Sequence, residues 1–115
     1  MATYAFAAPI LPGKVDEWKA FDKQLVGEKR SDYAASCQRA GLTRVAAFLQ
    51  RTPNGDLAVI VVESPGDPAQ ALRKFLEGTE PFDRWFATRV EAIYGVSATT
   101  MAKMPPNVQD LDWRA

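Results

Sequence analysis

The stretch at residues 41–63, GLTRVAAFLQRTPNGDLAVIVVE, constrains the fold most, because its pattern predicts a β-hairpin that is apolar on both faces. In the predicted turn, Pro53 sets φ for a type I turn, Asn54 suits the next position, and Gly55 takes the left-handed conformation of a G1 bulge. An antiparallel hairpin with one solvated face alternates apolar and polar residues, which this one does not. We therefore expect a sheet that is covered on both sides.

The predicted register follows from the length of the hairpin loop. A loop of three residues, 53–55, places Phe48 opposite Ile60. One predicted face then carries Val45, Ala47, Leu49, Leu57, Val59 and Val61, and the other carries Ala46, Phe48, Ala58, Ile60 and Val62.

Periodicity, capping residues and turn residues predict the remaining elements of the chain. They are a strand at residues 3–8, a helical stretch at 14–40 that can kink or break at 27–30, a short helix from Pro68 to Gly78, a helix from Pro81 to Gly95, and a last strand at 96–100. This order is that of an α+β, ferredoxin-like βαββαβ fold with a split last helix. Its helices cover one sheet face. We expect the other face to be covered by the sheet of a second copy of the chain. Two sheets packed face to face about a two-fold axis would form a dimeric α+β barrel.

The length of 115 residues predicts a single domain, 1–115, without a linker or internal repeat that would divide it. Residues 101–115 form a C-terminal tail that contains Trp113. A tryptophan so near a chain end is usually packed against other residues, because burial of this large aromatic side chain stabilises the protein. We therefore expect this tail to dock along its own subunit or along a partner subunit.

Charge and composition argue against several kinds of partner. The 14 basic and 14 acidic residues balance, and no basic stripe suggests nucleic acid. Residues 1–10 are apolar, but no basic region precedes them and no apolar span of about 20 residues follows, so we expect no membrane anchor and a cytoplasmic location. Cys37 has no cysteine partner, and its small neighbours predict an inert buried thiol rather than a nucleophile.

The residue types also limit the chemistry. With no His and one Cys, the chain lacks the usual zinc ligands and the Ser-His and Cys-His nucleophile pairs. No Gly-rich phosphate loop follows a strand. We therefore expect no metal site and no bound cofactor, and we assign no catalytic residue. Two carboxylate pairs, Asp16 with Glu17 and Asp110 with Asp112, suit a helix start and an exposed tail better than catalysis.

A frame of short motifs spans nearly the whole chain. It comprises Tyr4-Ala5-Phe6, Pro9-Ile10, Pro12-Gly13-Lys14, Arg39-Ala40-Gly41-Leu42, Leu49-Gln50, Thr52-Pro53, Gly55-Asp56, Pro81-Phe82-Asp83, Trp85-Phe86 and Gly95-Val96. This frame resembles a family of small uncharacterised bacterial proteins, which is similar in fold to the antibiotic-biosynthesis-monooxygenase and stress-responsive dimeric α+β barrel proteins. The chain departs from the family pattern at Tyr94, Phe48 and Val45, where His, Trp and Glu are expected. Lacking His, it lacks the usual ligand of the haem-binding branches.

The resemblance implies that a ligand pocket lies between the sheet and the helices. Candidate lining residues are Tyr4, Phe6, Trp18, Tyr33, Arg44, Phe48, Phe82, Trp85 and Phe86. For most of these, plain core packing is the alternative. Arg44 either meets an anionic group in the pocket or, as we favour, reaches water or pairs with a surface acid. Tyr4, Tyr33 and Tyr94 supply phenols that can orient a substrate or serve as core aromatics.

Two functions from different classes follow from the resemblance, whose wider superfamily hosts monooxygenases, cyclases, haem-degrading enzymes, dismutases and binding proteins. We favour a dimeric small-molecule-binding module with an aromatic-lined cavity for an apolar or aromatic ligand. The alternative is a cofactor-independent monooxygenase or cyclase acting on an aromatic, polyketide-like substrate. A purely structural dimer is a third possibility. A convergent polar group inside a cavity would favour the enzyme.

Overall fold

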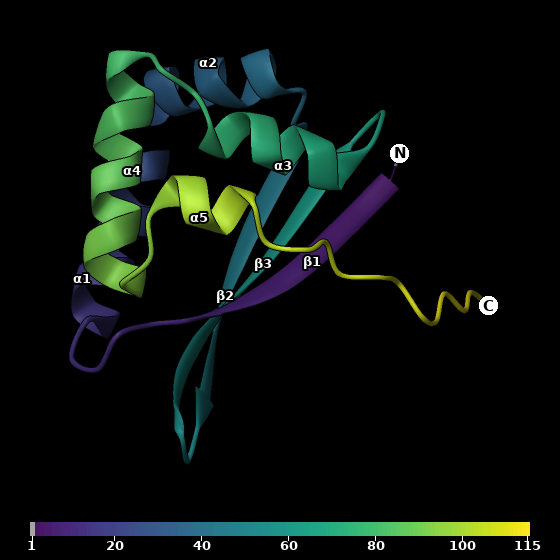
Figure 1. The fold of residues 1–115 in the computed structure, drawn as a ribbon, viewed down its shortest axis with the longest axis horizontal. Coiled ribbons are helices and arrows are strands. Elements are labelled where there is room, and N and C mark those ends of the chain that lie inside the picture. The colour runs from purple at the N-terminus through teal and green to yellow at the C-terminus, as the bar shows by residue number, and fades with distance from the viewer. Residues whose placement is uncertain (1) are drawn as a thin grey trace.

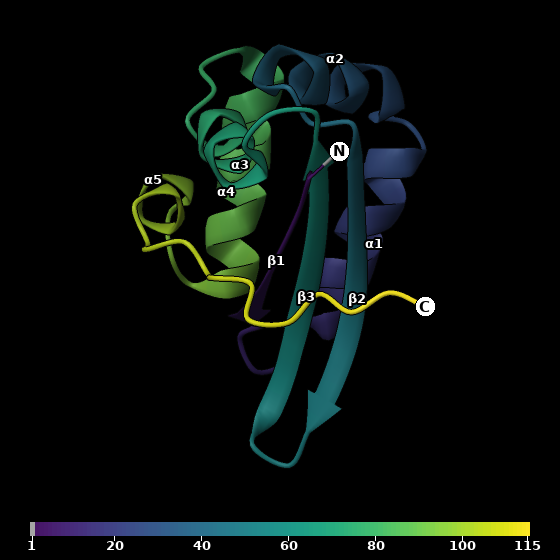
Figure 2. The ribbon, with the colours of Figure 1, turned by 90° about the vertical axis from the view of Figure 1, so that its right-hand side faces the viewer.

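The computed structural model describes residues 2–115, which form a three-stranded antiparallel sheet and five helices (Figure 1). In chain order the elements are β1 (Ala2–Pro9), α1 (Val15–Val26), α2 (Arg30–Ala40), β2 (Arg44–Thr52), β3 (Gly55–Ser64), α3 (Pro68–Leu76), α4 (Pro81–Tyr94) and α5 (Ala98–Ala102). The strand order is β1-β3-β2, and the helices lie on one side of the sheet (Figure 2). The predicted α+β class is confirmed. None of the helices formed by residues 2–115 combines the length and apolar character that a membrane span requires.

The helix ends follow the signals in the sequence. The predicted helical stretch breaks at Gly27, where a side chain would meet the Lys23 carbonyl oxygen at 2.8 Å. Gly41 ends α2 in the left-handed conformation, with φ 88°. Asp67 begins α3 by accepting hydrogen bonds from the backbone N–H groups of Ala69 and Gln70. The break in the first helical stretch and the split of the last helix into α3 and α4 are therefore confirmed.

The strand expected at residues 96–100 is wrong, because this segment enters the helix α5. The Ser97 side chain accepts a hydrogen bond from the backbone N–H of Thr100 at 3.0 Å, which caps the helix. At its other end, Arg73 Nε donates to the Ala102 carbonyl oxygen at 3.0 Å. These two hydrogen bonds stabilise a helical turn, and the modest β-propensity of the segment is not enough to form a strand instead. Residues 2–115 therefore contain no fourth strand to complete the predicted βαββαβ order.

The predicted hairpin register is also wrong, by one residue. Thr52 pairs with Gly55, so the loop contains only two residues, and Phe48 lies opposite Val59. The Thr52 hydroxyl accepts from the Asn54 N–H at 3.2 Å and donates to the Gly55 carbonyl oxygen at 2.6 Å, which closes the tight turn without a bulge. A shift of one residue moves every side chain of β3 to the other face relative to β2.

The corrected register gives a different pair of apolar faces. The face toward the helices carries Val45, Ala47, Leu49, Ala58, Ile60 and Val62. The other face, here called the open face, carries Ala5, Ala7, Ala46, Phe48, Leu57, Val59 and Val61. No helix formed by residues 2–115 covers the open face, and Phe48 is 57% exposed there. Both faces are still apolar, as the sequence predicts.

The C-terminal tail leaves α5 and passes the edge strand β1 on the side of the open face (Figures 1 and 2). Asn107 holds it there, since its backbone N–H donates to the Tyr4 hydroxyl at 3.0 Å and its Nδ2 donates to the Ala5 carbonyl oxygen at 2.8 Å. Beyond Asn107 the side chains are exposed, and Trp113 is 77% exposed. Trp113 therefore does not dock on its own chain.

The helical layer is joined by one buried polar group. Asp83, at the start of α4, is 7% exposed. Its carboxylate accepts from the Ser36 hydroxyl at 2.5 Å and from the Glu80 backbone N–H at 3.0 Å, and Arg39 lies 3.4 Å away. These contacts cap α4 and tie it to α2.

Replacing this carboxylate should weaken the fold. We expect Asp83→Ala to lower the free energy of unfolding by about 2 kcal/mol, because Ser36 and the α4 N-terminus lose their acceptor in a buried place. Asp83→Asn, which keeps one acceptor oxygen, should lose less. Urea unfolding measures both changes, and an unchanged midpoint for the alanine variant would contradict this role.

Candidate functional site

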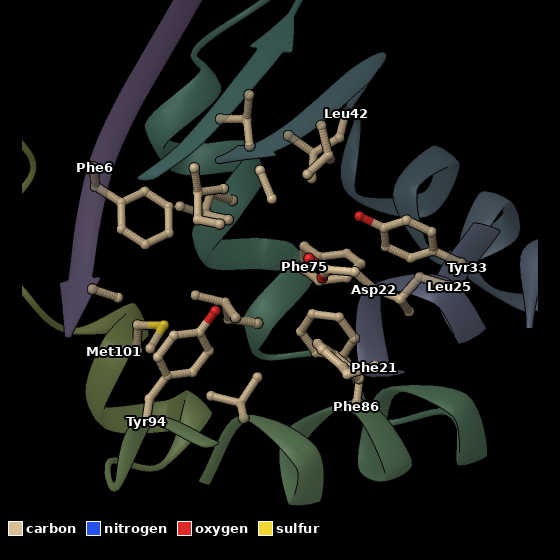
Figure 3. Close-up of a pocket in the computed structure, with 18 of the residues that line it drawn as sticks. Phe6, Phe21, Asp22, Leu25, Tyr33, Leu42, Phe75, Phe86, Tyr94 and Met101 are labelled. Atoms are coloured by element: carbon tan, nitrogen blue, oxygen red, sulfur yellow. The ribbon is translucent and has the colours of Figure 1, made fainter. Parts of the chain in front are cut away.

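A cavity of about 370 Å³ lies between the sheet and the helices (Figure 3). Strand residues line one side of it, namely Phe6, Ala8, Val45, Ala47, Ile60 and Val62. Helix residues line the other side, among them Phe21, Leu25, Tyr33, Phe75, Phe86, Tyr94 and Met101. The cavity is therefore mainly apolar and rich in aromatic rings, and its volume is in the range of small-molecule sites.

Asp22 brings a carboxylate to this apolar cavity from α1. Its side chain is half-buried, and within residues 2–115 it has no hydrogen-bond or ion-pair partner. Burial raises the pKa of Asp22 to about 6, because the ionised carboxylate is removed from water without compensation. Asp22 is therefore the one lining group whose shifted pKa lies near neutral pH.

Tyr94, the last residue of α4, points its hydroxyl into the cavity (Figure 3). Trp18 Nε1 donates to this hydroxyl at 2.9 Å, which leaves the phenol's own proton available for donation. Burial raises the pKa of Tyr94 to about 12, and the nearby charge of Asp22 acts in the same direction. Tyr94 is thus a neutral hydrogen-bond donor at physiological pH.

Tyr33 supplies a second phenol, from α2. Burial raises the pKa of Tyr33 well above its ordinary range, and the neighbouring Cys37 and Asp22 add to this. Burial also raises the pKa of Cys37 to about 11, partly offset by its hydrogen bond with Tyr33. The thiol is therefore neutral and a poor nucleophile, in agreement with the prediction from sequence.

The predicted pocket residues separate into three groups. Phe6, Tyr33 and Phe86 line the cavity. Trp18, Phe82 and Trp85 pack in the neighbouring hydrophobic core and do not line it, as the core-packing alternative predicts. Trp18 nevertheless contributes to the site through its hydrogen bond to Tyr94.

The remaining three predicted residues lie elsewhere. Tyr4 holds the tail through Asn107. Arg44 is exposed and pairs with Glu63 at 3.2 Å, which is the surface ion pair that we favoured. Phe48 lies on the open face because of the corrected register. None of the three lines the cavity.

Asp22 lines the cavity but was not selected from the sequence, and the same is true of Phe21 and Phe75. A usable signal exists, because Asp22 lies four residues after Trp18 and three before Leu25, on the apolar stripe of α1. A carboxylate on the buried stripe of an amphipathic helix is unusual.

Among the polar groups that line the cavity are the Asp22 carboxylate and the phenols of Tyr33 and Tyr94. In the part of the chain that the structure describes, no cluster of three or more His, Cys, Asp or Glu side chains is placed to hold a metal ion.

Comparison with family models, with curated proteins and with solved structures found no match to this chain.

The uncompensated charge of Asp22 should make stability depend on pH. The folded state holds the Asp22 proton up to about pH 6 and the unfolded state only to about 3.8, so this carboxylate makes stability fall as pH rises between the two values. At about pH 7.5, Asp22→Asn should stabilise the fold by about 1 kcal/mol, a value reduced to allow for partial solvent exposure. Near pH 4 the gain should vanish.

Thermal unfolding at the two pH values measures this difference. Asp16→Asn is the matched control, because Asp16 lies on the same helix but is exposed. A gain for Asp22→Asn that is equal at both pH values would show that its charge is not the cause.

Proposed function

We propose that the chain is a dimeric binding module of the α+β barrel type, which takes up one small apolar or aromatic molecule in the cavity of each protomer. The observation that carries this proposal is the cavity of about 370 Å³, which is largely apolar and has a few polar groups at defined positions. Binding sites for small molecules commonly have this composition.

The position of the cavity supports the family resemblance inferred from the sequence motifs. It lies between the sheet and the helices, where the resemblance places the ligand site. A ferredoxin-like sheet contains the order β1-β3-β2 and adds its fourth strand beside β1. In this chain Asn107 occupies part of that edge by bonding to the Ala5 carbonyl oxygen.

The open face supports dimerisation with a second copy of this chain. It presents an apolar surface over all three strands, and two such faces related by a two-fold axis would bury one another. The C-terminal tail runs on the same side of the sheet (Figure 2), and beyond the Asn107 anchor it contains the exposed residues Leu111 and Trp113. In the dimer each tail packs along the partner subunit, which buries Trp113.

A second candidate function is a cofactor-independent monooxygenase or cyclase that acts on an aromatic substrate. Asp22 favours it, because a carboxylate with a pKa near neutral in an apolar cavity suits proton abstraction. The Tyr94 hydroxyl would donate a hydrogen bond to the charge that develops on the substrate. Asp22 and Tyr94 meet the expectation that polar groups inside a cavity favour an enzyme, but we place this candidate second because the cavity accounts for binding without any reaction.

The binding proposal predicts that 2-methylnaphthalene, a fluorescent apolar probe, binds to the purified protein. Ala47→Phe should weaken binding about tenfold or more, because Ala47 lines the cavity and a larger side chain there fills it. Fluorescence titration measures both affinities, and recovery of the probe unchanged would separate binding from catalysis.

The matched control is Ala35→Phe, which adds the same side chain at an exposed position of α2. It should bind the probe as the parent does. If the parent protein does not bind the probe, the cavity is not a binding site for it. If Ala47→Phe binds the probe as tightly as the parent protein does, the probe binds elsewhere.

The dimer proposal predicts a dimeric mass in light scattering, and a monomer for Val59→Asp. Val59 lies on the open face opposite Phe48, so an aspartate there would put a charge into the proposed interface without entering the core of the protomer. Thr88→Asp, which places the same charge on an exposed part of α4, should remain dimeric. A monomeric parent protein would overturn the barrel.

A further inference from the structure

We propose that the ligand of the cavity is an aromatic or arylalkyl amine, bound as its ammonium cation with the Asp22 carboxylate as its counter-charge. This inference rests on the proposed binding function and specifies the chemical class of the ligand.

The cavity contains an unpaired carboxylate. Asp22 faces the cavity and finds no hydrogen bond or ion pair within residues 2–115. Folding has therefore already met much of the cost of removing this charge from water, as its raised pKa indicates. A cation that enters the cavity forms an ion pair with the Asp22 carboxylate. The electrostatic cost that still opposes binding is then the removal of the cation itself from water.

The groups around Asp22 leave its negative charge without a counter-charge. Lys23 also lines the cavity, but its side chain is exposed and the ion pairs of residues 2–115 do not include it. Tyr33 and Tyr94 interact electrostatically with Asp22, and Cys37 lies beside Tyr33; all three groups are neutral at physiological pH. The negative charge of Asp22 is thus not neutralised from within the cavity, which disfavours anions and favours a cation.

Aromatic rings form much of the helical side of the cavity. Phe21, Phe75 and Phe86 come from three different helices and pack against one another, with Phe86 5.1 Å from Phe21 and 4.9 Å from Phe75 between ring centroids. Aromatic rings stabilise a nearby ammonium through their π faces and pack against the aryl part of the same ligand. The lining therefore suits both ends of an arylalkyl amine.

A neutral ligand fits these observations less well. An apolar molecule would exclude the remaining water from Asp22 and leave its charge unpaired, which costs free energy. An alcohol or phenol would donate one hydrogen bond but leave the charge without a counter-ion, and hydrogen bonds between two ionised groups are the stronger kind. Charge therefore decides between ligands of the same shape.

Three probes of nearly equal shape test the inference, namely 2-naphthylmethylamine, 2-naphthalenemethanol and 2-methylnaphthalene. At about pH 7.5 the parent protein should bind the amine about tenfold or more tightly than the other two, because only the amine carries a positive charge. Asp22→Asn should remove this preference while it still binds 2-methylnaphthalene. Asp16→Asn, on the same helix, should keep the preference.

The pH dependence gives a second readout. The preference for the amine should fall as the pH is lowered through about 6, because Asp22 then takes up a proton, whereas binding of 2-methylnaphthalene should not weaken. Equal affinity of the amine and the alcohol would contradict the proposal that the ligand is a cation, and would favour a neutral ligand that donates a hydrogen bond. Equal affinity of all three probes would overturn the role of Asp22 and leave the binding function standing. Failure of all three to bind the parent protein would overturn the binding function itself.

Discussion

The pairing of β2 with β3 is the interaction on which the rest of the structure depends. Its register places Val45, Ala47 and Leu49 beside Ala58, Ile60 and Val62, so that one continuous apolar face meets the helices. The same register places Phe48 beside Val59 and builds a second apolar face on the other side. The helices can cover only one of the two, because they all lie on the same side of the sheet. The uncovered apolar surface of the open face thus originates in the hairpin itself.

The cavity is a consequence of how large and small side chains are distributed across the interface between the layers. Ala8 and Ala47 line it from the strands, and an alanine side chain fills little of the space between the two layers. On the helical side the rings of Phe21, Tyr33, Phe75 and Phe86 pack against one another, at centroid distances of 4.9 to 6.3 Å, so they are held by their neighbours. Small side chains on the sheet and fixed rings on the helices together leave space between the layers. The cavity therefore requires no irregular backbone.

Local signals in the sequence predicted those parts of the fold that local interactions decide. Gly41 and the Asp67 cap end or begin helices where expected, because each satisfies free backbone groups within a few residues. The hairpin register could not be predicted as safely. Pro53 favours a three-residue loop, because the preferred two-residue turns need a positive φ at their first position, yet Thr52 pairs with Gly55 across a loop of two residues. At residues 96–100 weak β-propensity competed with a serine cap, and the contact between Arg73 and Ala102, which is distant in sequence, supports the helix.

The candidate site was predicted in outline, as an aromatic region between sheet and helices, but its polar centre was not. Selection by aromatic type found Phe6, Tyr33 and Phe86, and it also found core residues, because a cavity wall and a packed core use the same side chains. Asp22 differs from them, since burying an unpaired carboxylate lowers stability at neutral pH and an amide of similar shape would avoid that cost. Residues that break a rule of folding in this way are concentrated at functional sites. The departure of Asp22 from the apolar stripe of α1 therefore carries more information about function than the aromatic residues around it.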